Sequence, residues 1–348
     1  MTHLLQKHTV DLYDLENESR QKEAVSARTL LSAARFDLFA KLFYIRHREI
    51  NPKLAKKIYE DHILAFNPDG KEPGRMDKNG THDFVETFDH LIGTFQKEEF
   101  DPQISLIPVD KNNIPLDGSH RIAALAYFDR KVSVLRFPEV QSKAIFDYSY
   151  FLRRGLSIES ADQIAGEILN YIPNLHIACL WPKMGNAKNK EFAFNYLKKH
   201  FSVYYSKTMR MSLEGLSRFI YESYKHQDWV GGEDNDYRGA RSKAANCYAA
   251  NAQVQFVLFE AADLEEVLKA KDAIREHYRL DKHALHITDD LNETQDIIDL
   301  IFTEQSRQFQ NSSFALRDRV QEFKNLVKNV YWLNFKVGIA KVLKKIKA

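Results

Sequence analysis

The stretch LIGTFQKEEFDPQISLIPVDKNNIPLDGSHRIAALAYF, residues 91–128, decides the fold of the first part of this 348-residue chain. It holds the end of an amphipathic helix, a strand over 104–109, a turn and a short strand over 114–116. The sequence Asp-Gly-Ser-His-Arg at 117–121 then runs directly into a helix, and a further strand is predicted over 132–137. Strands that alternate with helices over so short a distance are typical of a small α/β or α+β unit.

The segments on either side are predicted to be mainly helical until a second β-α-β-α pattern begins. Apolar residues recur every three or four positions over 27–50, and Pro52 opens a second helix over 52–66. After the glycine-rich stretch 228–243, strands and helices alternate again. The predicted fold class is therefore α+β, organised as an N-terminal helical segment (1–66), a small α/β domain (67–138), a mainly helical connector (139–227), a C-terminal α/β domain (228–316) and a basic amphipathic tail (317–348).

The composition is that of a folded and nearly neutral protein. Hydrophobic residues make up 44% and charged residues 28% of the chain, which excludes a disordered polypeptide. Fifty Lys and Arg residues balance 48 Asp and Glu residues. Nine of those cations and two acids lie in 317–348, so this tail carries +7 and the other 316 residues carry −5. Nucleic acid is therefore an unlikely partner, because duplex binding needs a basic face.

The chain is expected to be cytoplasmic. Its first residues lack the apolar core of a signal peptide, and no run approaches the ~18 apolar residues of a membrane span. Cys179 and Cys247 lack the spacing of a zinc site or a disulfide framework. Two interpretations of 317–348 remain open: a helix in peripheral contact with the inner membrane, or a helix docked on its own domain with a solvated lysine face.

The sequence Asp-Gly-Ser-His-Arg has the features of a phosphate-binding turn. Backbone N–H groups at the start of a helix are unpaired, and the helix dipole adds partial positive charge there. His120 and Arg121 supply further donors, and Asp117 could hold a metal ion or orient His120. The alternative is an ordinary helix cap made by Asp117 or Ser119.

The run 91–128 resembles the ParB/sulfiredoxin-like fold, whose members carry a DGxHR-type phosphate-binding turn after the same helix–strand–strand lead-in. The resemblance covers roughly residues 70–137. The histidine form of the motif is more similar to the nucleotide-using enzymes of that superfamily, including free-serine kinases, than to DNA-partitioning proteins, which typically carry arginine at the equivalent of His120. The wider layout, with RFDLFAK, YEDHILAF, RGARSKAANCY and HALHITDDLNET, also resembles ParB-domain proteins of bacterial capsule and lipopolysaccharide assembly.

This resemblance implies an ATP-dependent phosphotransferase, a kinase that acts with Mg²⁺ on a hydroxyl of a sugar, polyol or glycan-linked group in surface-polysaccharide biosynthesis. Glu72 would be the base for the acceptor hydroxyl, unless it is a solvated loop acid, and Asp117 would be a base or a metal ligand. The nucleotide phosphates would be bound by Gly118, Ser119, His120, Arg121 and Arg75.

A second group of candidate residues lies in the C-terminal part. Lys243, at the start of a helix, could bind an anion or nucleotide, although the spacing of a P-loop is missing. His286, Asp289, Asp290 and Glu293 lie within eight residues and could hold a divalent metal, with Asp289 as the chosen ligand. Asp290 and Glu293, three residues apart, are also the arrangement of a helix capping box.

In RFDLFAK, Asp37 and Lys41 are four residues apart, the spacing of an ordinary helix ion pair. Together with Arg35 they could instead brace the phosphate turn from outside. Isolated histidines such as His62 and His82 are interpreted as structural.

Two other functional classes remain open from the sequence. One is a ParB-like nucleic-acid-binding protein or nuclease, which the charge of −5 outside the tail disfavours. The other is a non-catalytic scaffold whose turn only senses a nucleotide.

Overall fold

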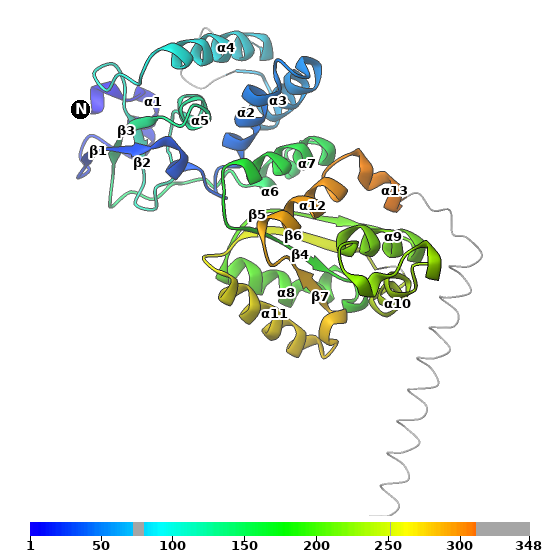
Figure 1. Cartoon of the computed structure of the whole chain (residues 1–348). Coiled ribbons are helices and arrows are strands. Elements are labelled where there is room, and N and C mark those ends of the chain that lie inside the picture. The colour runs from blue at the N-terminus through cyan, green and yellow to red at the C-terminus, as the bar shows by residue number, and fades with distance from the viewer. Residues whose placement is uncertain (72–79, 251, 311–348) are drawn as a thin grey trace, which may run out of the picture. The chain divides into compact units, whose positions relative to one another are not determined.

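The computed structural model of the chain describes residues 1–71, 80–250 and 252–310, and it divides them into two compact units (Figure 1). The first unit comprises Met1–Leu175 with Phe201–Tyr205 and Leu258–Glu260, and the second comprises the rest of the described chain. Helices and two small sheets make up the structure, so the fold is mixed α+β.

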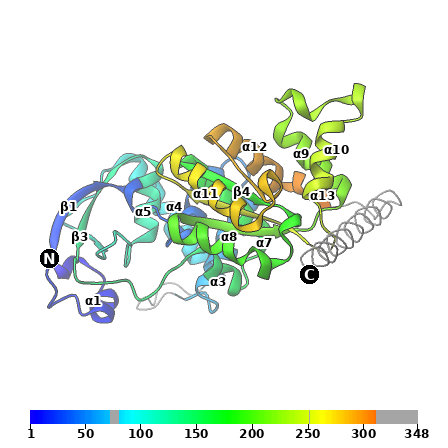
Figure 2. The same cartoon turned by 90° about the horizontal axis from the view of Figure 1, so that it is seen from below.

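The first unit contains a three-stranded sheet and seven α-helices among its described residues. The helices are α1 (Lys7–Tyr13), α2 (Phe36–His47), α3 (Pro52–Phe66), α4 (Thr81–Lys97), α5 (Ser119–Tyr127), α6 (Tyr148–Arg153) and α7 (Ile158–Glu167). The strands are β1 (Gln21–Ser26), β2 (Ile107–Val109) and β3 (Lys131–Arg136). The order is β1-β3-β2, with β1 antiparallel and β2 parallel to β3. Figure 2 shows β1 and β3 side by side near the N-terminus.

Helix α2 is the central helix of this unit. All ten residues from Phe36 to Ile45 are buried, because α3, α5 and α7 pack around it. The predicted helix over 27–50 is therefore too long: 27–30 form a short 3-10 turn, and the α-helix begins only at Phe36.

The other predicted elements of this unit are largely confirmed. Helix α3 has the predicted bounds, and α4, α5, β2 and β3 lie where the pattern indicated. The predicted strand over 114–116 is reduced to a single bridge between Val109 and Pro115. Strand β1 was missed, so 1–66 is not wholly helical. Its sequence QKEAVS has four exposed residues and gains its strand form from pairing with β3 at the sheet edge.

The second unit contains most of a four-stranded sheet in the order β5-β6-β4-β7, with β4 and β7 antiparallel. In Figure 1, α8 and α11 lie on one face of this sheet and α12 on the other. The strands are β4 (Leu175–Leu180), β5 (Ser202–Met209), β6 (Val254–Glu260) and β7 (Leu285–Ile287). The helices are α8 (Ala187–His200), α9 (Leu213–Tyr224), α10 (Arg238–Cys247), α11 (Leu264–Tyr278), α12 (Leu291–Ile301) and α13 (Arg307–Gln310).

The predicted β-α-β-α pattern is confirmed as β6, α11, β7 and α12. The connector predicted to be mainly helical, 139–227, contains helices α6 to α9 and also two strands that were missed, β4 and β5. All six residues of β4 are buried, so its sequence LHIACL shows no alternation of apolar and polar residues. A short buried run that is apolar apart from one histidine is compatible with either a helix or a strand, and only the neighbouring strands decide between them.

Within the described residues, no helix combines the length and the apolar character that crossing a lipid bilayer requires. The predicted basic tail, 317–348, lies outside the described residues.

Candidate functional site

The turn before α5 requires a glycine. Gly118 has a φ of +82°, in the left-handed region, and it is the N-cap residue of α5. A Cβ atom at this position would lie 2.4 Å from Cδ1 of Ile107 and 2.9 Å from Nη2 of Arg121. No side chain caps the helix, so the predicted alternative of a cap by Asp117 or Ser119 is wrong. The cap residue therefore supplies no side-chain oxygen to accept hydrogen bonds from the backbone N–H groups at the start of α5.

The polar side chains of the turn have partners that orient them. Nη2 of Arg121 lies 3.4 Å from Oδ2 of Asp117, and its Nη1 donates to Oγ of Ser105. Both side chains of the Asp117–Arg121 pair are about one-fifth exposed. Nε2 of His120 lies 2.8 Å from the hydroxyl of Tyr59, which α3 supplies. The side chains of Asp117, His120 and Arg121 are thus oriented by their partners, and those of Asp117 and Arg121 remain partly exposed to solvent.

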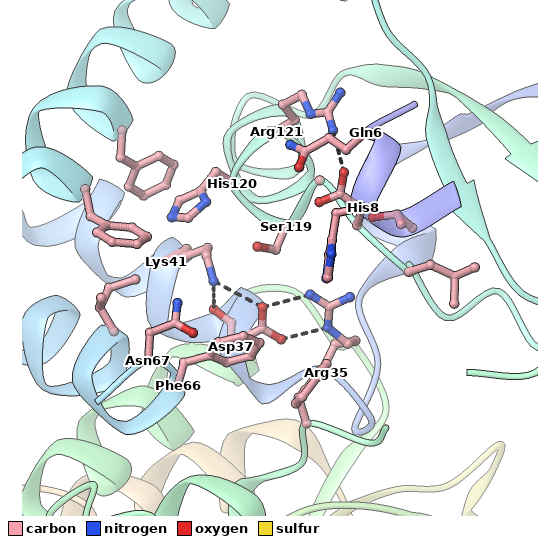
Figure 3. Close-up of a pocket in the computed structure, with 18 of the residues that line it drawn as sticks. Gln6, His8, Arg35, Asp37, Lys41, Phe66, Asn67, Ser119, His120 and Arg121 are labelled. Carbon is pink, nitrogen blue, oxygen red and sulfur yellow. Dashed lines mark hydrogen bonds and ion pairs between the residues drawn. The ribbon is translucent and has the colours of Figure 1, made fainter. Parts of the chain in front are cut away.

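These residues line a cavity of about 480 Å³ that lies within the first unit (Figure 3). Asp117, Gly118, Ser119, His120 and Arg121 all contribute to its wall, together with residues of α1, α2, α3 and α4. The volume is in the range of sites that bind small molecules. The structure therefore places the predicted turn in the wall of a cavity that is large enough for a small molecule.

A buried charged cluster forms another part of this wall. Nε and Nη2 of Arg35 donate to the two carboxylate oxygens of Asp37 at 2.8 and 2.9 Å, and Nζ of Lys41 lies 3.1 Å from Oδ2 (Figure 3). The three side chains are at most 5% exposed. Nη1 of Arg35 also donates to the carbonyl oxygen of Pro115, two residues before Asp117. The Asp37–Lys41 pair is thus part of a buried cluster that contacts the segment leading to the turn.

The pKa values in this cluster follow from burial and charge. Burial alone would raise the pKa of Asp37, but Arg35 and Lys41 outweigh it and hold this pKa well below its usual range. Burial, assisted by the charge of Lys41, lowers the pKa of His62 to about 3. Neutral His62 lies 3.4 Å from Nζ of Lys41 through Nε2 and 3.3 Å from the carbonyl oxygen of Tyr59 through Nδ1. Its Nδ1–H group can therefore donate to Tyr59 while Nε2 accepts from Lys41.

The remaining wall is apolar and largely aromatic. It is formed by side chains of α3, α4 and the segment before α6, namely Ile63, Phe66, Phe84, Phe88, Leu91 and Phe146. Among the described lining residues, four cationic side chains face two carboxylates, with Lys143 as the fourth cation. This arrangement suits a ligand that carries both negative charge and an apolar or ring-shaped part.

Four predicted site residues are not among the described residues that line this cavity. Glu72 and Arg75 lie outside the described residues. Lys243 and Asp289 belong to the second unit and do not line the cavity. Nζ of Lys243 donates to the carbonyl oxygen of Lys282 at 2.6 Å.

The proposed metal group of the second unit is occupied by structural contacts. Oδ1 of Asp290 accepts from the backbone N–H of Glu293 at 2.9 Å, and the Glu293 carboxylate accepts from the backbone N–H of Asp289 at 2.8 Å. Nε2 of His286 lies 3.0 Å from Oε1 of Glu293. The carboxylate of Asp289 accepts from Lys271. The capping alternative for Asp290 and Glu293 thus describes the start of α12.

Elsewhere in the described residues, ligand atoms of His82, Asp83 and Glu86 at the start of α4 lie within 4.8 Å of one another. Such exposed groups are common on protein surfaces without a metal, and this group carries no assignment.

From the sequence, Arg35 was predicted only to brace the phosphate turn from outside, and Tyr59 was given no role at the site. The available signal was that Asp37 and Lys41 interrupt a segment, 36–45, which is otherwise almost wholly apolar. Charged side chains inside a buried helix require partners, and Arg35 is the partner of Asp37 that this pattern pointed to.

The described residues thus form an α+β protein whose first unit contains a partly cationic, partly aromatic cavity. No family model, curated protein or solved structure matches the chain.

Proposed function

We propose that the cavity binds a nucleoside triphosphate and that the protein is an ATP-dependent phosphotransferase acting on a hydroxyl group. One observation carries this proposal: the glycine-initiated start of α5, with His120 and Arg121, lines a 480 Å³ cavity whose described charged side chains are predominantly cationic. Triphosphates are bound where backbone N–H groups, a helix dipole and charged donors converge.

In this proposal the residues Gly118 to Arg121 bind the nucleotide phosphates. The guanidinium of Arg121 and the imidazole of His120 stabilise the charge of the transferred phosphoryl group, since phosphoryl transfer depends mainly on positioning and electrostatics. The hydrogen bond between His120 and Tyr59 keeps the ring oriented toward the ligand.

Asp117 is the carboxylate that fits Mg²⁺. The only other carboxylate among the described lining residues, that of Asp37, is 1% exposed and bound by Arg35 and Lys41, whereas the Asp117 side chain is 18% exposed and lies 3.4 Å from Arg121. Magnesium is commonly held by one or two carboxylates together with substrate phosphates. When bound, the ion would neutralise charge on the phosphate oxygens. Asp289 is not part of this site, and the base function stays proposed for Glu72 or Asp117.

We further propose that residues 67–138 form a ParB/sulfiredoxin-like domain and that the acceptor is a sugar, polyol or glycan-linked hydroxyl of bacterial surface-polysaccharide assembly. The order β2, glycine turn, α5 and β3 supports the first part. The basic tail 317–348 would bring the protein to the inner membrane. Vesicle flotation tests this last step: the full chain should float with anionic vesicles, and a chain ending at residue 316 should not.

The first experiment is a thermal-shift screen with Mg²⁺ and ATP, ADP, CTP, GTP or UTP. A nucleotide that binds the native state raises the melting temperature. We expect a rise with ATP in the wild type and in the control variant His226→Ala, whose residue is exposed in the second unit, and none in His120→Ala. No shift with any nucleotide contradicts the proposal.

A second readout separates an enzyme from a nucleotide sensor. Asp117→Asn should retain nucleotide binding and lose phosphoryl transfer from labelled ATP to a glycan extract. Binding without any transfer by the wild type would instead favour the non-catalytic scaffold.

A further inference from the structure

Arg35 is a buried cation with unused hydrogen-bonding capacity at the cavity. An arginine side chain has five N–H donors. Three of those of Arg35 are used, two by Asp37 and one by the carbonyl oxygen of Pro115. The other two, one on each Nη atom, have no acceptor among the described residues. The side chain is 5% exposed, and Figure 3 shows its guanidinium group directed toward His8 across the cavity.

An anion would satisfy these two donors. A buried N–H group without an acceptor costs free energy, because it has lost its hydrogen bond to water. A carboxylate or phosphate in the cavity would supply the acceptor oxygens.

Arg35 and Arg121 belong to different elements of the cavity wall. The guanidinium of Arg35 comes from the N-cap position of α2, is held by its two bonds to Asp37, and also contacts Pro115 in the segment before α5. Arg121 is itself anchored by Asp117 and Ser105. The cavity therefore contains two arginines, each fixed to a different element by its own carboxylate.

We propose that Arg35 forms a second anion subsite and that the molecule receiving the phosphoryl group is an acid, whose carboxylate or phosphate binds the two unused N–H groups of Arg35. This inference rests on the proposed function for the role of acceptor, whereas the subsite itself rests only on the geometry of Arg35. A guanidinium fork binds such groups through two parallel hydrogen bonds, which a lysine cannot reproduce.

The test measures melting temperature in the full chain with inorganic phosphate as the probe, at constant ionic strength maintained with chloride. With the wild type saturated by a non-hydrolysable ATP analogue, added phosphate should raise the melting temperature further. In Arg35→Lys the phosphate concentration needed for half of that rise should increase at least tenfold, while the shift by the analogue is retained. His226→Ala, at an exposed position of the second unit, is the control and should keep both the analogue shift and the phosphate response.

A second variant covers the case in which Arg35→Lys does not fold. The double variant Arg35→Gln/Asp37→Asn removes both members of the pair and leaves no unpaired carboxylate beside Lys41. It should also lose the phosphate response.

Three results would overturn the inference: no phosphate response in the analogue-saturated wild type, displacement of phosphate by the analogue, or a response that persists unchanged when Arg35 is replaced. If the analogue has no effect but the phosphate response depends on Arg35, the nucleotide function fails and the anion subsite stands. The class of the acceptor is then tested by glycerol 3-phosphate against glycerol, of which only the acid should raise the melting temperature.

Discussion

The carboxylate of Asp37 has two cationic partners, and no side chain of this cluster is more than 5% exposed. Removing Asp37 takes away the carboxylate that both Arg35 and Lys41 contact, in a region that solvent barely reaches. Breaking a buried ion pair by deleting one partner typically costs 3–5 kcal/mol, because the remaining charge is uncompensated.

We therefore expect Asp37→Ala to lower the free energy of unfolding by about 4 kcal/mol, as measured by urea denaturation. The double variant Arg35→Gln/Asp37→Asn should lose less than the single variant. If both variants lose the same amount, the charge imbalance is not the cause.

His62 gives the same cluster a dependence on pH. In the folded chain its pKa is lowered from 6.5 to about 3, so the unfolded state binds one proton more between these values. Stability is then greatest at neutral pH and is lost as the pH falls from 6.5 toward 3. Between pH 7.5 and pH 5 we expect this group to remove about 2 kcal/mol.

The variant His62→Gln cannot titrate, and its side-chain oxygen can still accept from Lys41. Its urea midpoint should change less between pH 7.5 and pH 5 than that of the wild type. His226→Gln, at an exposed position, is the control and should follow the wild type. An unchanged acid sensitivity in His62→Gln would exclude this histidine as the source.

Among the single elements, helix α12 is stabilised at its start by Asp290 and Glu293, two of the residues that the sequence also suggested as metal ligands. Asp290 accepts from the backbone of Glu293, and Glu293 in turn accepts from the backbone of Asp289. Replacing an N-cap aspartate by alanine costs about 1 kcal/mol. We expect Asp290→Ala to lower stability by about that amount, and EDTA to leave the melting temperature of the wild type unchanged. A fall in melting temperature on chelation would instead favour a metal at these residues.

At the scale of the whole molecule, the two groups of candidate residues belong to different units. Every described residue that lines the cavity is in the first unit, while Lys243 and Asp289 are in the second. Hydrogen exchange in the full chain with the ATP analogue and Mg²⁺ should therefore slow in peptides covering the start of α2 and the start of α5. Local opening is suppressed where the ligand binds.

Peptides covering α10 and the start of α12 should exchange at an unchanged rate. Protection confined to those peptides would move the nucleotide to Lys243 and Asp289 and contradict the assignment to α5.

Local chemistry was sufficient to predict several elements and the turn. The proline and apolar period of α3, and the glycine between a strand and a helix at 118, act within a few residues of themselves. The same holds for the cap of α12, where Asp290 and Glu293 are three residues apart. These features could be predicted because the interactions that stabilise them span a single turn of chain.

Features that depend on distant residues were decided only by the tertiary structure. Strand β1 has a polar sequence and exists through β3, and the apolar run of β4 becomes a strand between its neighbours in the sheet. The bond from Arg35 to Pro115 joins residues 80 positions apart, and the contact of His120 with Tyr59 joins residues 61 apart. Burial turned an ordinary helix pair, Asp37 and Lys41, into part of a cavity wall, and burial is a property of the packed chain that no local pattern encodes.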